Sequence, residues 1–179
     1  MDFRHSQTWR NLKQACEREW RASGQYRLFA DRAREDGYEH MGALFDETAR
    51  NEQEHAQLWW RYLRAGEDPT TQDLLIEAAS GEHHEWTSLY QAYAATARQE
   101  GFDHLADLFD QVATVERNHD RRFRRLAENL QGNRVFCQEE ERVWVCGHCG
   151  CLTRGACAPA YCPVCRQPQG AFSLYCENF

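Results

Sequence analysis

The feature that most constrains the fold of this chain is an internal duplication. Residues 26–55 match residues 90–119 at a constant offset of 64 positions. Each copy lacks proline and carries a glycine, Gly37 or Gly101, where one helix can end and another begin, so the duplicated unit is predicted to be a helical hairpin. The identical pairs are Tyr26/Tyr90, Ala30/Ala94, Ala33/Ala97, Arg34/Arg98, Gly37/Gly101, His40/His104, Leu44/Leu108, Phe45/Phe109, Asp46/Asp110, Ala49/Ala113, Glu52/Glu116 and His55/His119.

Each copy ends in the same pair of polar side chains, Glu52 with His55 and Glu116 with His119. A spacing of three residues places both side chains on one face of a helix, about one turn apart. A carboxylate beside an imidazole suits iron, manganese or zinc. One such pair on a charged helix is usually a pair of solvated surface residues. Two copies packed face to face, however, give the arrangement of carboxylate-bridged two-metal sites in helix bundles.

The helical part of the chain is predicted to contain four long helices. A break at Gly66–Pro69 separates the second from the third, and Thr70 or Thr71 can cap the helix that follows. The predicted fold class is therefore mainly α, with a four-helix bundle. The expected helices run from about Ser6 to Asp36, Tyr38 to Ala65, Gln72 to Glu100 and Phe102 to Leu130.

Seven polar side chains are predicted to point into this bundle. Glu82 and Glu85 repeat the three-residue spacing on the third helix, whereas at least one of His83 and His84 must face away. Five carboxylates and two imidazoles fit two irons that change oxidation state better than one zinc, which takes four ligands and often cysteine. The predicted metal ligands are Glu19, Glu52, His55, Glu82, Glu85, Glu116 and His119.

Composition limits the size and the partners of the protein. A chain of 179 residues that is 42% apolar can bury the core of one ordinary domain plus a small appendage. A net charge of −7 argues against nucleic acid or an anionic membrane as the main partner. The basic residues at 121–125 are expected to form an exposed helix face. No apolar leader segment or membrane-spanning run is found, so we expect a soluble, cytoplasmic protein.

The sequence changes character after Gly132. Helical periodicity stops, glycine, proline and cysteine become frequent, and β-forming residues occur at Val135, Phe136 and 143–145. We therefore divide the chain into a helical domain of residues 1–132 and a small β-rich domain of residues 133–179.

The second domain contains two Cys-x-x-Cys pairs, Cys146 with Cys149 and Cys162 with Cys165. This spacing is a strong signal for a tetrahedral site of four thiolates, and such a site stabilises a domain too small to fold on its core alone. The spacing leaves a zinc ribbon and a one-iron redox site as alternatives. Buried or surface thiols are expected at the remaining cysteines, which are Cys16, Cys137, Cys151, Cys157 and Cys176.

These motifs resemble those of rubrerythrins, in which a ferritin-like di-iron four-helix bundle is followed by a rubredoxin-like domain. The resemblance covers nearly the whole chain. Two residues depart from the pattern: Cys151 stands where an aromatic residue is usual, and Arg166 replaces a small residue, but neither removes a ligand. The motifs that carry the resemblance are Glu19 with Tyr26, Glu52-x-x-His55, Gly81-Glu82-x-x-Glu85 with Tyr90, Glu116-x-x-His119, and Val143-Trp144-Val145-Cys146-x-x-Cys149 with Cys162-Pro163-x-Cys165.

The resemblance implies a role for each ligand of a di-iron site. Glu52 and Glu116 would bridge the two irons. Glu19 would bind the first iron, and Glu82 with His119 would bind the second. One further iron would be held by the four cysteines, where zinc is the alternative.

The resemblance also implies an activity, the reduction of hydrogen peroxide to water by a non-haem di-iron peroxidase. The first iron would be bound by Glu85 when ferric and by His55 when ferrous, and Tyr26 and Tyr90 would form hydrogen bonds around the site. Electrons would come from NAD(P)H through a rubredoxin reductase or a similar donor and the rubredoxin-like iron. The expected role is defence against oxidative stress.

Two other functions compete with this one. The bundle could oxidise and store iron as ferritins do, with structural zinc on the four cysteines. Against storage, the bundle lacks a run of extra acidic residues, and a storage protein has no evident use for a ligand pair such as His55 and Glu85. The third alternative is a redox sensor that binds a partner through its rubredoxin-like domain.

A homodimer with exchanged helices is also expected. In the ferritin-like fold that the resemblance implies, the second and third helices run parallel, so their connection must travel about 30 Å along the bundle. Residues 66–71 could cover only about 20 Å when extended. The first two helices of one chain would therefore pack with the last two of its partner.

Overall fold

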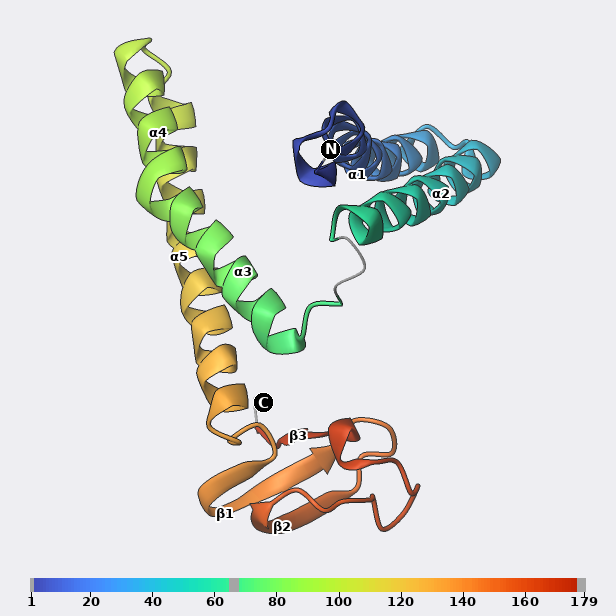
Figure 1. The fold of residues 1–179 in the computed structure, drawn as a ribbon, viewed down its shortest axis with the longest axis vertical. Coiled ribbons are helices and arrows are strands. Elements are labelled where there is room, and N and C mark those ends of the chain that lie inside the picture. Colours follow the sequence, from blue (N-terminus) through green and yellow to red (C-terminus); the bar gives the residue numbers. More distant parts are fainter. Residues whose placement is uncertain (1, 65–67, 177–179) are drawn as a thin grey trace. The chain divides into compact units, whose positions relative to one another are not determined.

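The computed structural model describes residues 2–64 and 68–176 of the chain (Figure 1). Two compact units make up the chain, residues 1–68 and residues 69–179. The predicted fold class is confirmed, since long helices precede a small three-stranded antiparallel sheet. The predicted break at 66–69 falls partly on residues 65–67, which lie outside the described residues. Among the described residues, no helix is both long and apolar enough to cross a membrane.

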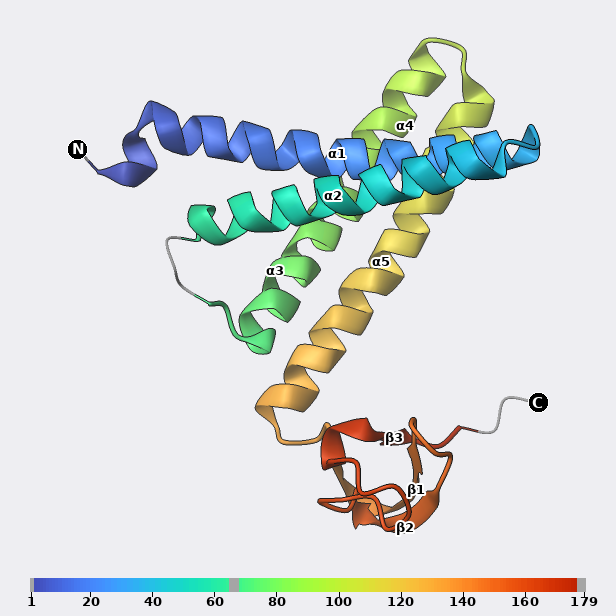
Figure 2. The ribbon, with the colours of Figure 1, turned by 90° about the vertical axis from the view of Figure 1, so that its right-hand side faces the viewer.

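The first unit is a hairpin of two helices, α1 (Gln7–Glu35) and α2 (Glu39–Leu63), preceded by the short η1 (Phe3–His5). Figures 1 and 2 both show α1 and α2 side by side along their length. The Ser6 side chain accepts a hydrogen bond from the backbone N–H of Trp9 and caps α1. The bounds of both helices agree with the predicted ones to within two residues.

Small residues form the seam of this hairpin. At every seventh position a buried small residue faces the other helix, which lets the two backbones approach closely. The side chains of Ser23 and Cys16 also donate hydrogen bonds across the seam, to the carbonyls of Ala49 (2.8 Å) and Ala56 (3.3 Å). The buried seam residues are Cys16, Ser23 and Ala30 on α1 and Gly42, Ala49 and Ala56 on α2.

The helices of the second unit are α3 (Thr71–His84), the π-helical η2 (Glu85–Leu89), α4 (Tyr90–Gln99) and α5 (Asp103–Gln131). Thr70 caps α3 in a reciprocal arrangement with Asp73, as one of the two predicted caps. We predicted one regular helix from Gln72 to Glu100. That prediction is wrong in one respect, because a π-helical turn interrupts the helix in its middle.

The duplication extends to the hydrogen bonds of the two hairpin turns. Gly37 and Gly101 adopt left-handed φ angles of 85° and 84°, which favour glycine at the end of a helix. The residue after each glycine donates its N–H to a carbonyl five positions earlier, which closes the helix end in the same way twice. The two matched bonds run from Tyr38 N to Ala33 O and from Phe102 N to Ala97 O, both 2.8 Å.

The C-terminal part of the second unit is an antiparallel sheet in the order β2–β1–β3, formed by β1 (Cys137–Cys146), β2 (Leu152–Cys157) and β3 (Phe172–Leu174). Its core is built around Trp144, which is fully buried and donates its indole N–H to the carbonyl of Gly155 at 3.0 Å. Cys146 and Cys162 belong to the same buried cluster. The sheet therefore holds one cysteine of each Cys-x-x-Cys pair in its core.

A disulfide joins Cys137 to Cys157 at the outer end of the β1–β2 pair. Our expectation of unpaired thiols is wrong for these two cysteines. The reason lies in the strand register, because four residues of β1, 138–141, stand opposite Ala156 alone on β2 between this pair and the next. Such a bulge sets the register and leaves no clear mark in the sequence. Cys16 is a buried thiol and Cys176 an exposed one, as expected.

Candidate metal centres

The first hairpin brings three of the predicted ligands together. Glu19 projects from α1, and Glu52 and His55 project from neighbouring turns of α2. The His55 Nδ1 atom lies 3.1 Å from Glu52 Oε2 and 4.0 Å from Glu19 Oε2. One donor atom from each of the three residues fits within 4.8 Å of the others. Two carboxylates and an imidazole at this separation can hold one metal ion and leave positions on it open.

The second hairpin repeats this group with Glu82 of α3 and Glu116 and His119 of α5. The His119 Nδ1 atom lies 2.7 Å from Glu116 Oε2 and 3.5 Å from Glu82 Oε2. These donor atoms also lie within 4.8 Å of one another. The duplication of the sequence is thus a duplication of a Glu–Glu–His group, with one group in each unit.

The carboxylates of each group contact one another closely, and this changes their pKa values. The hydrogen bond with Glu52, followed by burial, raises the pKa of Glu19, whereas hydrogen bonds with Glu19 and His55 lower the pKa of Glu52. In the second group, burial and then the hydrogen bond with Glu116 raise the pKa of Glu82. Neighbouring carboxylates that share protons in this way favour a cation, which would displace the proton. The donor set therefore fits a metal.

The seventh predicted ligand, Glu85, stands outside both three-residue groups and begins the π-helical turn η2. Its charge nevertheless acts on the second group, because it contributes to the raised pKa of Glu82. Burial and then the charges of Glu85 and Glu116 raise the pKa of Tyr90. The phenol of Tyr90 therefore stays protonated at neutral pH and can donate a hydrogen bond.

A buried carboxylate that we did not predict lies beside the second group. Asp120, which is only 5% exposed, accepts hydrogen bonds from His83 Nδ1 (3.0 Å), Trp86 Nε1 (3.0 Å) and Arg124 Nε (2.5 Å). Burial alone would raise the pKa of Asp120, but the bonds from Trp86, His83 and Arg124 hold it below its usual value. In the sequence Asp120 resembles one more charged residue of an exposed helix face, so nothing marked it.

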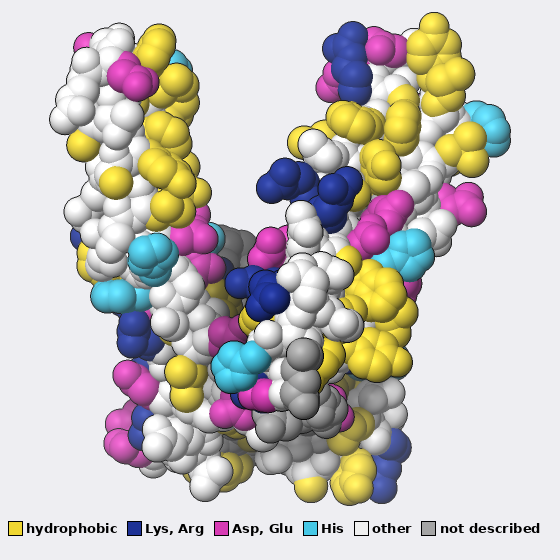
Figure 3. Space-filling model, turned by 45° about the horizontal axis from the view of Figure 1, so that its top comes forward, with side chains coloured by type: hydrophobic (Ala, Val, Ile, Leu, Met, Phe, Trp, Pro, Cys, Tyr) yellow, Lys and Arg dark blue, Asp and Glu magenta, His cyan; other side chains and the backbone are white. Residues whose placement is uncertain are grey.

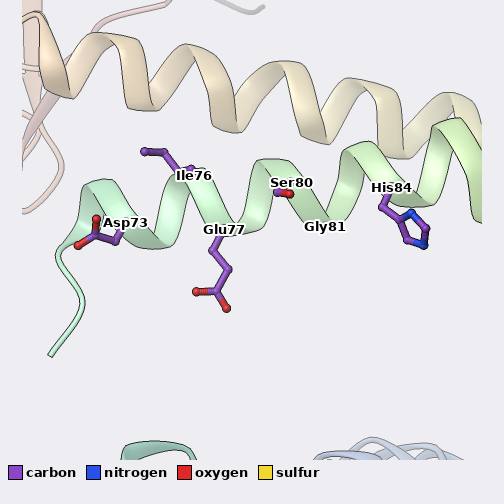
Figure 4. Close-up of a pocket in the computed structure, with 6 residues that line it drawn as sticks. All are labelled: Asp73, Ile76, Glu77, Ser80, Gly81 and His84. Carbon is purple, nitrogen blue, oxygen red and sulfur yellow. The ribbon is translucent and has the colours of Figure 1, made fainter. Parts of the chain in front are cut away.

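His84 and His83 point in different directions. Figure 4 shows His84 and Glu77 directed away from α5, on an open cavity of about 510 Å³ along α3. His83 bonds Asp120 instead. Neither histidine belongs to the Glu–Glu–His group of this hairpin. The cavity is lined by Asp73, Ile76, Glu77, Ser80, Gly81 and His84.

Aromatic and apolar side chains lie next to both groups. Tyr26 stacks on Phe45 with ring centroids 6.2 Å apart, and Tyr90 lies 6.1 Å from Phe109 at the matching positions of the second hairpin. Figure 3 shows hydrophobic side chains gathered along the surface of the helices, beside acidic ones. In each unit large apolar residues remain exposed, among them Leu28, Leu44, Leu58, Leu105, Leu108 and Leu126.

The four cysteines of the Cys-x-x-Cys pairs converge at one end of the sheet. The Sγ atoms of Cys146 and Cys165 lie 3.7 Å apart, and those of Cys149 and Cys162 lie 3.6 Å apart. A tetrahedron with metal–sulfur bonds of about 2.3 Å has edges of about 3.8 Å. The sulfurs therefore stand almost where one metal ion would hold them.

The thiols of this group lie close enough to change one another's pKa values. Burial alone would raise the pKa of Cys162, but the backbone N–H groups of Cys165 and Val164 and the neighbouring thiols lower it to about 6. The N–H of Gln167 opposes the effect of burial and of the other thiols on Cys165, whose pKa nevertheless rises to about 12. Negative charge thus collects on Cys162, which favours a cation at the centre of the group.

Known proteins are similar to this chain in sequence over nearly its whole length. The sequence model of the Rubrerythrin family matches residues 10–127 and 73–146. Rubrerythrin-1 of Clostridium acetobutylicum is 36% identical over 97% of this chain and 97% of its own length. Rubrerythrin of Porphyromonas gingivalis is 37% identical over 97% of this chain and 92% of its own length.

Among solved structures, the fully reduced, all-ferrous state of nigerythrin aligns with 27% identity over 95% of this chain and 87% of that chain, with a TM-score of 0.36. The two Glu–Glu–His groups and the four-cysteine group are consistent with the iron sites of rubrerythrins. By its sequence over nearly its whole length, this chain belongs to the rubrerythrin family.

Proposed function

We propose that this protein is a non-haem di-iron peroxidase that reduces hydrogen peroxide to water. The observation that carries the proposal is the pair of matching Glu–Glu–His groups on duplicated hairpins, in a chain that also carries a four-cysteine group. Each helical group offers three ligand residues, which leave positions on one iron open. Two groups facing each other, with Glu85 as a seventh ligand, would hold two irons.

Two ferrous ions bound there would supply both electrons that break the O–O bond of peroxide. The protein's own task is then to place the peroxide and supply protons, since two electrons and two protons convert one hydrogen peroxide into two water molecules. The protonated phenol of Tyr90 can donate a hydrogen bond to an oxygen near Glu85 and Glu116. Tyr26 occupies the equivalent position in the first hairpin.

We further propose that the electrons originate from NAD(P)H, reach the protein through a reductase and enter at the four-cysteine site. The sulfur separations fit iron and zinc equally well, but iron alone can change oxidation state there. In this proposal residues 1–132 form the peroxide-reducing domain and residues 133–179 the electron-entry domain.

We also propose that each di-iron site is shared between two chains of a homodimer. The helix geometry of α2 continues to Arg64, and Thr70 already caps α3. Only six residue steps remain between them, about 20 Å when fully extended. If α2 and α3 run parallel and His55 and Glu82 lie at the same height in the bundle, the connection must run back along the parts of both helices that separate it from these residues. That distance is about 30 Å. Exchange of hairpins removes this conflict and covers the exposed apolar residues of both.

The activity is tested by mixing the fully reduced protein with hydrogen peroxide or oxygen in a stopped-flow instrument. We expect much faster oxidation by peroxide. Glu85→Ala should slow the peroxide reaction by about tenfold or more while ferrous binding stays near that of the wild type. Glu54→Ala, which removes an exposed carboxylate of α2, is the control. Equal rates with both oxidants would indicate a ferroxidase, and full turnover without Glu85 would remove that ligand from the account.

A further inference from the structure

The two copies of the hairpin differ in length by one residue, and the extra residue lies close to the predicted ligand Glu85. Glu19 and Tyr26 are seven residues apart on α1, whereas Glu82 and Tyr90 are eight apart in the second copy. The extra residue falls where the second copy forms the π-helical turn Glu85–Leu89. A π-helical turn holds one more residue than an α-helical turn, so it absorbs the insertion and leaves the flanking segments in register.

Two side chains near this turn donate hydrogen bonds to nearby backbone carbonyls. The Thr87 hydroxyl donates to the carbonyl of His83 at 2.6 Å. The amide of Gln91 donates to the carbonyl of Trp86 at 3.2 Å. Both bonds lie within the helix, so they do not fix the turn against the neighbouring helix.

Asp120 of α5 supplies that fixation. Its carboxylate accepts from His83, two residues before the turn, and from Trp86, the second residue of the turn, both at 3.0 Å. Glu85 lies between these two donors in the chain. The rings of His83 and Trp86 also contact each other edge to face, with centroids 5.3 Å apart. Two rigid side chains on either side of Glu85 are thus tied to one buried acceptor.

The first hairpin serves as an internal comparison. At the constant offset of 64, the position of Asp120 is occupied by Ala56, a fully buried residue of α2. The first helix of that copy, α1, runs as one α-helix from Gln7 to Glu35. The first copy, which lacks the insertion, therefore has Ala56 at this position. The second copy, which has the insertion, has Asp120, whose carboxylate bonds the irregular turn.

We infer that Asp120 is a positioning residue for Glu85, holding the π-helical turn against α5 through His83 and Trp86. The inference deepens the proposed function and rests on it, because Glu85 matters as the ligand outside the three-residue group. Asp120 also follows His119 directly, so one residue pair on α5 carries a ligand of the group and the anchor of the turn. Loss of the anchor should free the turn and misplace Glu85 without removing any donor atom.

The first test uses metal-free protein and reads the turn itself. Asp120→Ala gives α5 the residue that the first hairpin has at Ala56. We expect amide hydrogen exchange in residues 86–90 to become about tenfold faster, the effect of one lost hydrogen bond of ordinary strength. Trp86→Phe, which removes only the indole N–H, should act in the same direction and keeps the test valid if Asp120→Ala folds poorly. Asp110→Ala is the control. Asp110 lies on α5, as Asp120 does, and is the exposed ion-pair partner of Arg98 on α4.

The second test uses iron-loaded protein. We expect Asp120→Ala and Trp86→Phe to lower kcat with little change in KM and to shift the reduction potential of the bundle irons, while the potential of the four-cysteine site stays constant. Unchanged exchange in residues 86–90 in both variants would overturn the inference even if the wild type is a peroxidase. Faster amide exchange in residues 86–90 with an unchanged reduction potential of the bundle irons would overturn the inference as well. Asp120 would then stabilise the turn without positioning Glu85. A wild type without peroxidase activity would refute the proposed function instead.

Discussion

At the residue scale, the two Glu-x-x-His pairs were predictable because both members of each pair lie on a single helix. Glu52 and His55 are held three residues apart by helix geometry alone, and the structure places their side chains 3.1 Å from each other. Some contacts between segments far apart in the chain could not be predicted from the sequence. The bonds of Asp120 and the disulfide between Cys137 and Cys157 depend on how helices and strands pack, which spacing does not reveal.

Arg166 adopts a left-handed backbone conformation that favours glycine over residues with a side chain. It follows the last cysteine of the four-thiolate group, as Gly150 follows Cys149, and both adopt left-handed φ angles, 63° and 74°. A side chain in this region costs about 1–2 kcal/mol, whereas glycine adopts it freely at a smaller cost in unfolded-state entropy. At this position the sequence also departs from the small residue that its resemblance to rubrerythrins implies.

We therefore expect Arg166→Gly to raise the free energy of unfolding of the C-terminal domain by about 1 kcal/mol. Chemical denaturation followed by amide hydrogen exchange in β1, which carries the buried Trp144, measures this. Arg154→Gly, in β2, is the control and should destabilise the domain, because a strand residue loses its β-forming side chain. A loss of stability in Arg166→Gly would show that the guanidinium makes a contact that outweighs the backbone cost.

At the element scale, the sequence predicted where helices begin and end but not how regular they are. The ends of α1, α2 and α5 lie within two residues of the prediction because glycines and capping side chains mark them. The π-helical turn was missed, although the change from seven residues between Glu19 and Tyr26 to eight between Glu82 and Tyr90 was present in the sequence. Helical propensity does not distinguish an α-helical from a π-helical turn.

Deletion of Ser88 tests whether the turn arises from one inserted residue. The deletion restores the seven-residue spacing, so we expect a continuous α-helix, buried seam residues that stay in place, and a free energy of unfolding within about 1 kcal/mol of the wild type. Deletion of Gly24, the position equivalent to Ser88 in α1, is the matched control. It would rotate one half of α1 by about 100° and should cost about 4 kcal/mol or more.

Thermal and urea unfolding followed by circular dichroism compares the two deletions. An equal loss of unfolding free energy in both deletion variants would contradict the view that η2 is an insertion that the helix tolerates. A peroxidase rate lowered in the Ser88 deletion, with stability retained, would separate the role of the turn in placing Glu85 from any role in folding.

At the scale of the whole molecule, two hairpins each carry one Glu–Glu–His group, and we propose that the two groups form one site. Each Glu–Glu–His group consists of three ligand residues, and both hairpins expose large apolar residues. The sequence predicted this division through its repeat. We propose that the hairpins that combine come from different chains, because the connection between α2 and α3 is short.

Subunit mixing of Glu52→Ala with Glu116→Ala tests this central claim most directly. If the two groups form one centre, each variant alone should lose both bundle irons and its peroxidase activity. In exchanged dimers, half of the randomly reassociated dimers contain both variants, and each of these has one site built from two intact halves. The account predicts recovery of about a quarter of the wild-type iron and activity on mixing, by this counting of symmetric pairs. Variants that keep a bundle iron on the unchanged group, or a mixture as inactive as its parents, would contradict it.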